Sequence, residues 1–407
     1  NSYHVVYANN VTAATRLDGF KIVSGYSNGG FSLIENGGGL YINNSSMTVA
    51  NCIFFANHAE YEGGAVYHQG SGILNLDNCK FYNNTSGSSG GAISFRSNQL
   101  RITKCDISEN QASGFGGAIF VFEGTATLDR CIISGNIADR AGAIEVYDNG
   151  STNIFNSLFA GNQANGVAVM FISDLENFQS HTFWNNTVVN NKATGALTLM
   201  VNRYSDIRNC IIWGNETDFT FGVSQFTISD CIVEGATGGT NILSVNPQFT
   251  QPGNGALAPF NASAYNYRVQ LTSPSINNGN NSFVSSSYNK DLDDSSRIFS
   301  GTVDIGCYER YFCPASINIS ASGPTSFCNG GSVTLTSQQG NYYSWNTGSN
   351  NQSITVSSGG TYSVTVIDTN GCLGSASQQI LIDNASAFIN GDTILCNGEN
   401  TLLTAVS

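Results

Sequence analysis

The sequence predicts an all-β protein, in which a right-handed, single-stranded parallel β-helix is followed by an immunoglobulin-type β-sandwich. Two short sequence words recur in phase about every 26 residues. The runs between them are rich in β-forming residues and lack the 3.6-residue periodicity of helices. The C-terminal part changes to short alternating runs rich in Ser, Thr and Val.

The two repeated words define the β-helical coil. The first is an apolar residue, two variable residues and Asn: FFAN at 54–57, FYNN at 81–84, ISEN at 107–110, ISGN at 133–136, FAGN at 159–162, VVNN at 188–191 and IWGN at 212–215. The second is a Gly-Ala word: GGAV at 63, GGAI at 90, GGAI at 116, AGAI at 141, GVAV at 166 and GALT at 195. A unit of this length, with three short strands and sharp corners, returns to its start one strand spacing higher, about 4.8 Å.

Equivalent residues of successive coils should therefore stack. Asn tolerates the positive φ of a corner at low cost, and it can pass its side-chain amide from coil to coil. We expect one such column to contain Asn57, Asn84, Asn110, Asn136 and Asn162. The apolar residues of the Gly-Ala word keep their character, so we expect them to point inward: Val66, Ile93, Ile119, Ile144 and Val169.

Cysteines form a second predicted column. Cys52, Cys79, Cys105 and Cys131 recur with the coil, and the series continues at Cys210 and Cys231 after a gap. Stacked side chains point the same way, at a spacing wider than the Cβ–Cβ distance of about 3.8 Å that a disulfide prefers. We expect buried thiols that pack as small apolar residues, with a disulfide or a metal site among them as the less favoured alternatives.

Composition excludes several classes of function. Charged residues make up 11% of the chain, the net charge is −13 and the pI is about 4.5, with no basic cluster that could bind nucleic acid. No apolar run is long enough for a membrane-spanning helix. The first residues lack the features of a signal peptide and the sequence stops within a repeat, so we expect a segment of a longer mature protein.

Residues from about 240 to 310 are predicted to cap the coil stack. The words NPQF at 246–249, YRVQLTSPSINNG at 267–279 and KDLDDSSRIFSGTVDIGCYE at 290–309 resemble the C-terminal end of bacterial surface β-helix proteins, and HVVYANNVTAATRLDGFKIVSG at 4–25 resembles their first coil. The GGAI and FxxN words resemble those of the polymorphic outer-membrane proteins, which are adhesins. The resemblance covers residues 1 to about 310 and implies a pectin lyase-like fold at a cell surface.

The C-terminal part is predicted to hold one immunoglobulin-like sandwich at 314–383 and the truncated start of a second at 384–407. CNGGSVTLT at 328–336 recurs as CNGENTLLT at 396–404. These words resemble the tandem modules of surface proteins exported by type IX secretion. The resemblance implies a disulfide between Cys328 and Cys372, and a further disulfide between Cys307 and Cys313 is an open alternative for pinning the cap.

Catalysis is not expected. Enzymes with this fold gather carboxylates from the same strand of neighbouring coils. The corresponding outward positions here are Ser94, Phe120, Glu145 and Met170, which supply one carboxylate. We therefore predict no catalytic residue and no cofactor.

A calcium site at Asp291, Asp293 and Asp294 is the one metal site considered, because these residues form a D-x-D-D run. The favoured alternative is a structural role, in which Asp293 or Asp304 pairs with Arg297 to fix the cap.

These features together favour a non-enzymatic, extracellular protein of a bacterial surface, an adhesin or coat component exported as part of a larger protein. Its expected partners are surface glycans or other cell-surface and secretion-machinery proteins. Exposed aromatic residues are the candidate contacts: Tyr61, Phe115, Tyr147 and Phe219. The alternatives are a polysaccharide-active or carbohydrate-binding β-helix of the pectate-lyase type, and a passive spacer.

Overall fold

The computed structural model describes most of the chain and forms two compact units, Asn1–Arg310 and Tyr311–Ser407, each of which is considered by itself. The described residues are 3–28, 35–172, 179–195, 197–200, 205–216, 226–236, 238–253, 260, 264–299, 301–310, 317–367, 373–383, 388–390, 394, 396–398, 400, 402 and 404–406. Within these ranges the regular elements are β-strands, apart from one 3-10 turn, η2 (Asn281–Phe283).

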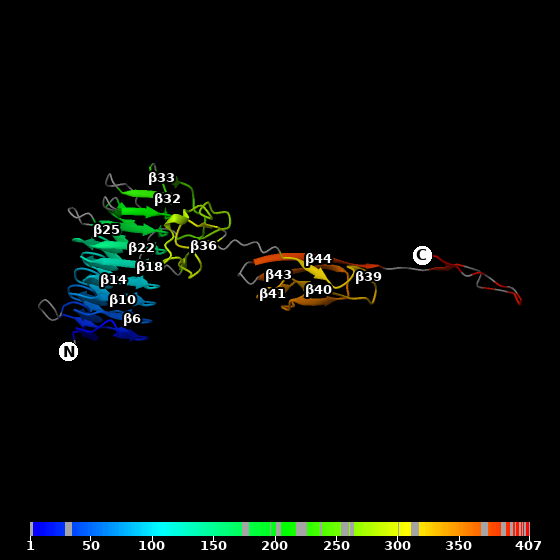
Figure 1. The fold of residues 1–407 in the computed structure, drawn as a ribbon, viewed down its shortest axis with the longest axis horizontal. Helices are drawn as coiled ribbons and strands as arrows, with labels where there is room; N and C mark the ends of the chain where they lie inside the picture. The colour runs from blue at the N-terminus through cyan, green and yellow to red at the C-terminus, as the bar shows by residue number, and fades with distance from the viewer. Residues whose placement is uncertain are drawn as a thin grey trace. The chain divides into compact units, whose positions relative to one another are not determined.

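The first unit is a parallel β-helix whose strands stack in columns (Figure 1). One column is an eight-stranded sheet of β1 (Val6–Asn9), β5 (Leu40–Asn43), β9 (Val66–Gln69), β13 (Ile93–Arg96), β17 (Ile119–Phe122), β21 (Ile144–Tyr147), β25 (Val167–Ile172) and β29 (Leu197–Met200). A seven-stranded sheet contains β4 (Tyr26–Ser27), β8 (His58–Ala59), β12 (Thr85–Ser86), β16 (Gln111–Ala112), β20 (Ile137–Ala138), β24 (Gln163–Ala164) and β28 (Lys192–Ala193).

The third sheet bends in every coil, so two columns of strands contribute to it. The first contains β2 (Arg16–Asp18), β6 (Met47–Ala50), β10 (Ile73–Asp77), β14 (Gln99–Thr103), β18 (Thr125–Asp129), β22 (Ser151–Phe155), β26 (His181–Trp184) and β30 (Ser205–Arg208). The second contains β3 (Lys21–Val23), β7 (Ile53–Phe55), β11 (Lys80–Tyr82), β15 (Asp106–Ser108), β19 (Ile132–Ser134), β23 (Leu158–Ala160), β27 (Thr187–Val189) and β31 (Ile211–Trp213). β32 (Thr227–Val233) pairs with the last strand of each column, and β33 (Thr240–Leu243) pairs with β32.

Strand register aligns the inward residues of the Gly-Ala words. Val66, Ile93, Ile119 and Ile144 lie opposite one another in successive strands and are wholly buried. The prediction is wrong in β25, where Met170, and not Val169, lies opposite Ile144. Met170 belongs to the buried core cluster together with Ile144, so its predicted outward position is also wrong. The reason is the length of this coil: β25 pairs with the preceding coil at a spacing of 26 residues, both at Ala141↔Val167 and at Ile144↔Met170, whereas the words AGAI at 141 and GVAV at 166 are 25 residues apart.

The ladder asparagines form one continuous column, which is buried from Asn57 to Asn191. Each side-chain Nδ2 donates to Oδ1 in the next coil over 2.9–3.0 Å, from Asn57 through Asn84, Asn110, Asn136, Asn162 and Asn191 to Asn215. Each receiving Oδ1 also accepts the backbone N–H of the preceding asparagine, as Asn110 does from Asn84 at 3.0 Å. The amides therefore satisfy buried backbone groups at the corners.

The left-handed backbone conformation lies one residue before the ladder. Ala56, Asn83 and Glu109 have φ values of 52°, 54° and 56°, and the ladder asparagine that follows each of them is not among the positive-φ residues. The positive φ of the corner and the ladder hydrogen bonds therefore belong to adjacent residues, not to a single Asn as expected.

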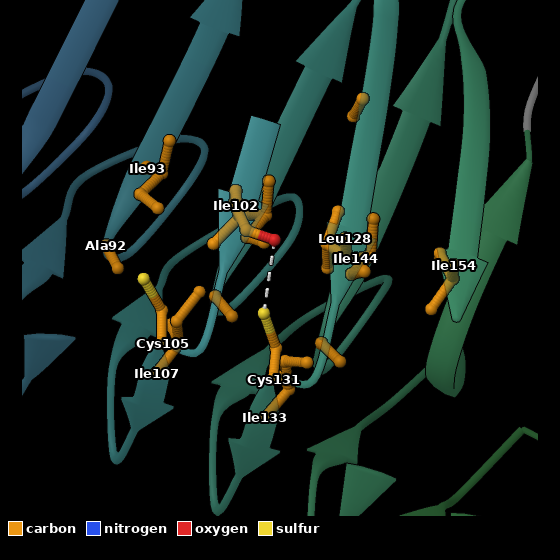
Figure 2. Packing of buried hydrophobic residues seen from close by; sticks show 14 of the residues in the cluster. Ala92, Ile93, Ile102, Cys105, Ile107, Leu128, Cys131, Ile133, Ile144 and Ile154 are labelled. Atoms are coloured by element: carbon orange, nitrogen blue, oxygen red, sulfur yellow. Dashed lines mark hydrogen bonds between the residues drawn. The ribbon is translucent and has the colours of Figure 1, made fainter. Parts of the chain in front are cut away.

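The cysteine column lines the core at the bend of the third sheet. Cys52, Cys79, Cys105 and Cys131 are at most 2% exposed. Figure 2 shows Cys105 and Cys131 on neighbouring coils, with the Cys131 thiol 3.5 Å from the carbonyl oxygen of Ile102. The backbone N–H of Cys79 donates to the Cys105 sulfur at 3.3 Å, so the thiols also accept weak hydrogen bonds.

Two polar residues fill the gap in the cysteine series. The backbone N–H of Cys131 donates to Ser157 Oγ at 3.0 Å, and that of Ser157 donates to Asn186 Oδ1 at 2.8 Å. The N–H of Asn186 in turn donates to the Cys210 sulfur at 3.4 Å. This position therefore requires a small acceptor, and cysteine is one of three residue types that supply it.

Residues 246–310, which we term the flank segment, lie along the side of the coils (Figure 1, yellow-green). Their strands are β34 (Phe249–Gln251), β35 (Asn266–Val269), β36 (Ile298–Phe299) and β37 (Thr302–Val303). Outward apolar residues of β23, β27 and β31 form one core with the segment: Leu158, Ala160, Val189 and Ile211 with Phe249, Phe260, Tyr267 and Ile305. The predicted position over the end of the stack is wrong, because the segment covers this apolar flank instead.

The second unit contains two small sheets around one core. One sheet has β38 (Ile319–Ala321), β40 (Val333–Ser337) and β42 (Ser353–Val356), and the other has β39 (Ser326–Cys328), β44 (Leu373–Asp383), β43 (Gly360–Ile367) and β41 (Tyr342–Trp345). Trp345, Leu335 and Val366 are buried in the shared core. Beyond them, β45 (Phe388–Asn390) and β46 (Thr404–Val406) form an antiparallel pair.

Candidate functional site

Charged and aromatic side chains gather on the outward face of the eight-stranded sheet. Tyr67, Ser94, Phe120 and Glu145 lie opposite one another in β9, β13, β17 and β21. They alternate with the core residues, so they point away from the core, yet all four are buried. We call this face the ledge and define it by Glu62, Tyr67, Ser94, Arg96, Phe115, Phe120, Phe122, Arg140, Glu145, Tyr147 and Phe171.

Turns that precede the strands bring further side chains onto the ledge. Glu62, Ser89 and Phe115 are stacked by isolated parallel bridges just before β9, β13 and β17. Glu62 therefore reaches the following coil, where its carboxylate accepts from Ser94 Oγ at 2.9 Å. This local path explains how an acidic side chain that is 2% exposed reaches a partner in the next coil.

Glu62 is fully engaged by Arg96. The guanidinium donates from Nε to Oε2 at 2.7 Å and from Nη2 to Oε1 at 2.5 Å, which is a bidentate pair. Burial alone would lower the pKa of Arg96, but the hydrogen bond and charge of Glu62 outweigh it and raise the pKa. The face of the Arg96 guanidinium lies 4.3 Å from the ring centroid of Phe122, a cation–π distance.

A second arginine–glutamate pair lies higher on the ledge. Arg140 is ion-paired with Glu145, whose side chain is wholly buried. Burial raises the pKa of Glu145, and the hydrogen bond from Arg140 opposes that rise. The Arg140 guanidinium lies between two rings, 4.2 Å from the centroid of Phe115 and 4.8 Å from that of Phe171.

An open hollow of about 580 Å³ lies at the lower part of the ledge. Its lining consists of Glu35, Asn36, Tyr61, Glu62, Tyr67, Gln69 and Arg96. Gln69 Nε2 donates to the hydroxyl of Tyr41 at 2.8 Å, which fixes the amide at the hollow. The ring of Tyr61 is 51% exposed.

The two acidic groups of the ledge are poorly placed to act as a pair. The Glu62 carboxylate is at Ser94, and Ser94 is two strands from Glu145, a separation of about 10 Å at the usual strand spacing. Glycosidase carboxyl pairs are about 5–9.5 Å apart. Because Glu62 and Glu145 are each also neutralised by an arginine, the ledge offers stacked rings, guanidinium groups and amides for binding, with Glu35 as a further carboxylate at the hollow.

A family model described as the right handed beta helix region matches residues 2–169 and 117–292. The chain belongs to this family. A search of curated proteins found no match. Because one fold can host many unrelated functions, membership establishes the architecture of this β-helix protein and leaves its activity to be argued from its surface.

Among the described residues, no three His, Cys, Asp or Glu side chains are grouped to hold a metal ion. No helix in the described part of the chain is long and apolar enough to cross a membrane.

Sequence reasoning found part of the ledge. Of the predicted contact residues, Tyr61 and Tyr147 are 51% and 42% exposed, and Phe115 is half-buried against Arg140. Phe219 lies outside the described residues. The sequence did not indicate the two arginines, because they occupy different positions in the repeat. Arg96 is in a strand, whereas Arg140 is in a turn.

The predicted calcium ligands of the β-helix are directed to different partners. Asp291 accepts backbone N–H groups from Asp293, Ser295 and Glu309 at 3.1, 2.7 and 2.9 Å. Asp293 pairs with Arg268, and Asp294 pairs with Lys104 and Arg130. These residues therefore hold the flank segment together and against the coils.

Arg297 is the centre of the flank segment and is wholly buried. Its Nη2 donates to the backbone oxygen of Asp304 at 2.8 Å and its Nη1 lies 3.7 Å from Glu309 Oε2. The expected pairing with Asp293 is wrong, because Arg268 takes that carboxylate, and the contact with Asp304 uses the backbone instead of the carboxylate. Arg297 also reaches Asn185 Oδ1 in the coil at 3.3 Å, which ties the segment to the β-helix.

Glu309 should make the β-helix less stable as the pH rises. Burial raises its pKa from 4.5 to about 9, so between these values the folded chain holds a proton that the unfolded chain has lost. Stability therefore falls with rising pH across this window, and Glu309→Gln should flatten the fall. Denaturant unfolding of the full chain, followed by circular dichroism at several pH values, measures the slope.

Glu60→Gln is the matched control for this prediction, because the Glu60 side chain is 58% exposed. It should leave the pH profile unchanged. Burial also raises the pKa of Asp291 and Asp304, so a smaller slope of the same sign should persist in Glu309→Gln. An unaltered slope in that variant would contradict the assignment.

Both predicted disulfides remain predictions. Cys307 is wholly buried, with its backbone N–H donating to Thr187 Oγ1 at 3.0 Å, and Cys328 is exposed. Their expected partners, Cys313 and Cys372, lie outside the described residues.

Proposed function

We propose that this β-helix protein is a non-catalytic adhesin at a bacterial cell surface, and that it binds its partner through the ledge. The observation that carries the proposal is the neutralisation of both ledge carboxylates by arginines that stack on aromatic rings. A surface on which the charges are paired and aromatic rings are numerous is suited to binding a partner. The resemblance of the GGAI and FxxN words to those of adhesins supports the same function.

The second unit fits a surface protein. Its two sheets around Trp345 are compatible with an immunoglobulin-like module, and its sequence words resemble modules exported by type IX secretion. Such a module would act as a spacer between the β-helix and an anchor elsewhere in a longer protein. A disulfide between Cys328 and Cys372 would suit an oxidising, extracellular setting.

The chemistry of the ledge favours a surface glycan as partner. The apolar edges of rings such as Phe122 and Tyr147, which are stacked with their centroids 5.8 Å apart, can contact the C–H groups of sugars. The amide of Gln69 and the guanidinium edges of Arg96 and Arg140 can bond to hydroxyl groups. The rings and hydrogen-bonding groups follow the coil axis, which suits an extended chain of sugars.

A glycan array probed with the full chain tests the proposal. We expect saturable binding, and we expect the double variant Phe122→Ala/Tyr147→Ala to lose about tenfold in affinity, equivalent to about 1.4 kcal/mol. Tyr342→Ala is the matched control, because that ring is 50% exposed but lies in the second unit. Equal binding by the double variant and the wild type would remove the ledge as the contact surface.

Two further outcomes separate the alternatives. Cleavage of a polysaccharide by the purified chain would overturn the non-catalytic assignment in favour of an enzyme. Deletion of residues 1–310 in the producing bacterium should reduce its attachment to glycan-coated surfaces. Undiminished attachment would favour a passive spacer.

A further inference from the structure

A second cavity lies between the coils and the flank segment. It has a volume of about 480 Å³, within the usual range of small-molecule pockets, about 300–1,000 Å³. The coils contribute residues at the ends of β27 and β31, and the flank segment contributes β34, β35 and their neighbours. We call this cavity the amide pocket, lined by Val189, Asn190, Trp213, Gly214, Asn246, Gln248, Phe249, Thr250, Pro252, Gly253, Tyr267 and Gln270.

The lining of the amide pocket has no ionisable acid or base apart from a tyrosine. Its described residues include none of Asp, Glu, Lys, Arg or His, in a chain that carries a net charge of −13. An ionic ligand would have no counter-charge there, and burying an unpaired charge is costly. The occupant should therefore be neutral.

Side-chain amides set the polarity of the pocket. Gln248 uses Oε1 to accept from Thr272 at 2.6 Å, which leaves its NH₂ group as a donor. Gln270 uses Nε2 to donate to the backbone oxygen of Phe249 at 3.2 Å, which leaves Oε1 as an acceptor. These two glutamines therefore present one donor and one acceptor from fixed positions, a combination that matches hydroxyl groups, which both donate and accept.

The far wall of the pocket is aromatic and firmly held. The hydroxyl of Tyr267 lies 2.8 Å from the side-chain amide of Asn190, which joins the flank segment to the coil. Burial raises the pKa of Tyr267, so this hydroxyl stays neutral. Trp213 is half-buried at the pocket, so part of its indole ring can contact a ligand.

We propose that the amide pocket binds a neutral saccharide unit, a hexose or an N-acetylhexosamine, with the sugar ring against Trp213 and its polar groups on Gln248 and Gln270. A polymer of charged sugars is disfavoured there, because the described lining residues supply no counter-charge. The assignment does not depend on the ledge, because the two sites share no residue.

Fluorescence titration of the full chain tests the proposal, because Trp213 is one of three tryptophans and lines the pocket. The probes are glucose, N-acetylglucosamine and glucuronate. We expect at least one of the two neutral sugars to change the emission saturably, with a Kd of about 1 mM or below, and glucuronate to bind at least about tenfold more weakly. Trp213→Phe should abolish the fluorescence change, while calorimetry on that variant still detects the sugar.

Paired variants make the test specific. Gln248→Leu/Gln270→Leu should weaken neutral-sugar binding at least about tenfold while the circular dichroism spectrum and Tm stay near those of the wild type. Gln111→Leu, at an exposed position on another sheet, is the control and should bind normally. The ledge variant Phe122→Ala/Tyr147→Ala should also bind normally at this pocket, so failure of one site can be told from failure of the other.

Three results would overturn the proposal. The first is no saturable response to either neutral sugar. The second is equal affinity for glucuronate, which would show that charge plays no part in selection. The third is unchanged binding by Gln248→Leu/Gln270→Leu in a folded protein, which would place the sugar elsewhere.

Discussion

Arg297→Met should lower the free energy of unfolding of the β-helix by about 3–5 kcal/mol, the usual cost of removing one partner from a buried ion pair. The arginine is wholly buried, and its charge favours the ionised forms of the buried carboxyl groups of Asp291 and Asp304. Glu309 is protonated at neutral pH, because burial raises its pKa to about 9. Without Arg297, the carboxyl groups of Asp291 and Asp304 therefore lose the cation that offsets the cost of their burial. Methionine fills a similar volume, so the expected loss is electrostatic and not due to a cavity.

Thermal and denaturant unfolding of the full chain measure this effect. Arg101→Met is the control, because Arg101 is exposed in β14 and should change stability by less than about 0.5 kcal/mol. The double variant Arg297→Met/Asp304→Asn should recover part of the loss, because it removes the buried charge of Asp304 together with that of the arginine. A single variant as stable as the control would show that Arg297 does not hold the flank segment.

Asn110→Leu should destabilise the β-helix by about 3–6 kcal/mol, because it leaves several buried polar groups without hydrogen-bond partners, at a cost of about 1–3 kcal/mol each. The Asn110 amide accepts from the backbone and side chain of Asn84 at 3.0 and 2.9 Å. It also donates to the backbone oxygen of Phe81 at 2.9 Å and to Asn136 Oδ1 at 3.0 Å. Leucine has a similar size but can satisfy none of these groups.

Asn98→Leu supplies the comparison for the ladder, since Asn98 is exposed at the turn before β14. Its melting temperature should stay close to that of the wild type, whereas Asn110→Leu should melt many degrees lower. Amide hydrogen exchange adds a local readout: the N–H of Asn84 should lose protection in Asn110→Leu. Retained protection at Asn84 would mean that another group replaces the Asn110 amide as the acceptor of this N–H.

The repeat spacing was enough to predict the coil, because identical words recur wherever the backbone returns to the same place. It therefore located the core residues Val66, Ile93, Ile119 and Ile144 without a structure. It failed at β25, where Met170 lies opposite Ile144. There the strands pair at a spacing of 26 residues, whereas the words AGAI at 141 and GVAV at 166 are 25 residues apart, so the word lies one residue out of step with the strand.

The ledge and the flank segment could not be predicted in the same way. Lys104 and Asp294 are in contact although 190 residues separate them, and no spacing rule links a repeat to a segment without repeats. The partners Glu62 and Arg96 lie in different parts of their coils, so they form no column in the sequence. Apolar outward residues such as Val189 and Ile211 were a usable signal, because solvent-facing strand positions rarely repeat them without cover.

The asparagine column also has a direction. From Asn57 to Asn215 each amide offers its NH₂ group to the oxygen of the next, so the dipoles of the side chains are parallel and add along the coil axis. Turning a single amide around would set nitrogen against nitrogen on one side and oxygen against oxygen on the other, breaking two links at once. Orientation is consequently a collective property of the row, and the polarity is the same at every coil along it.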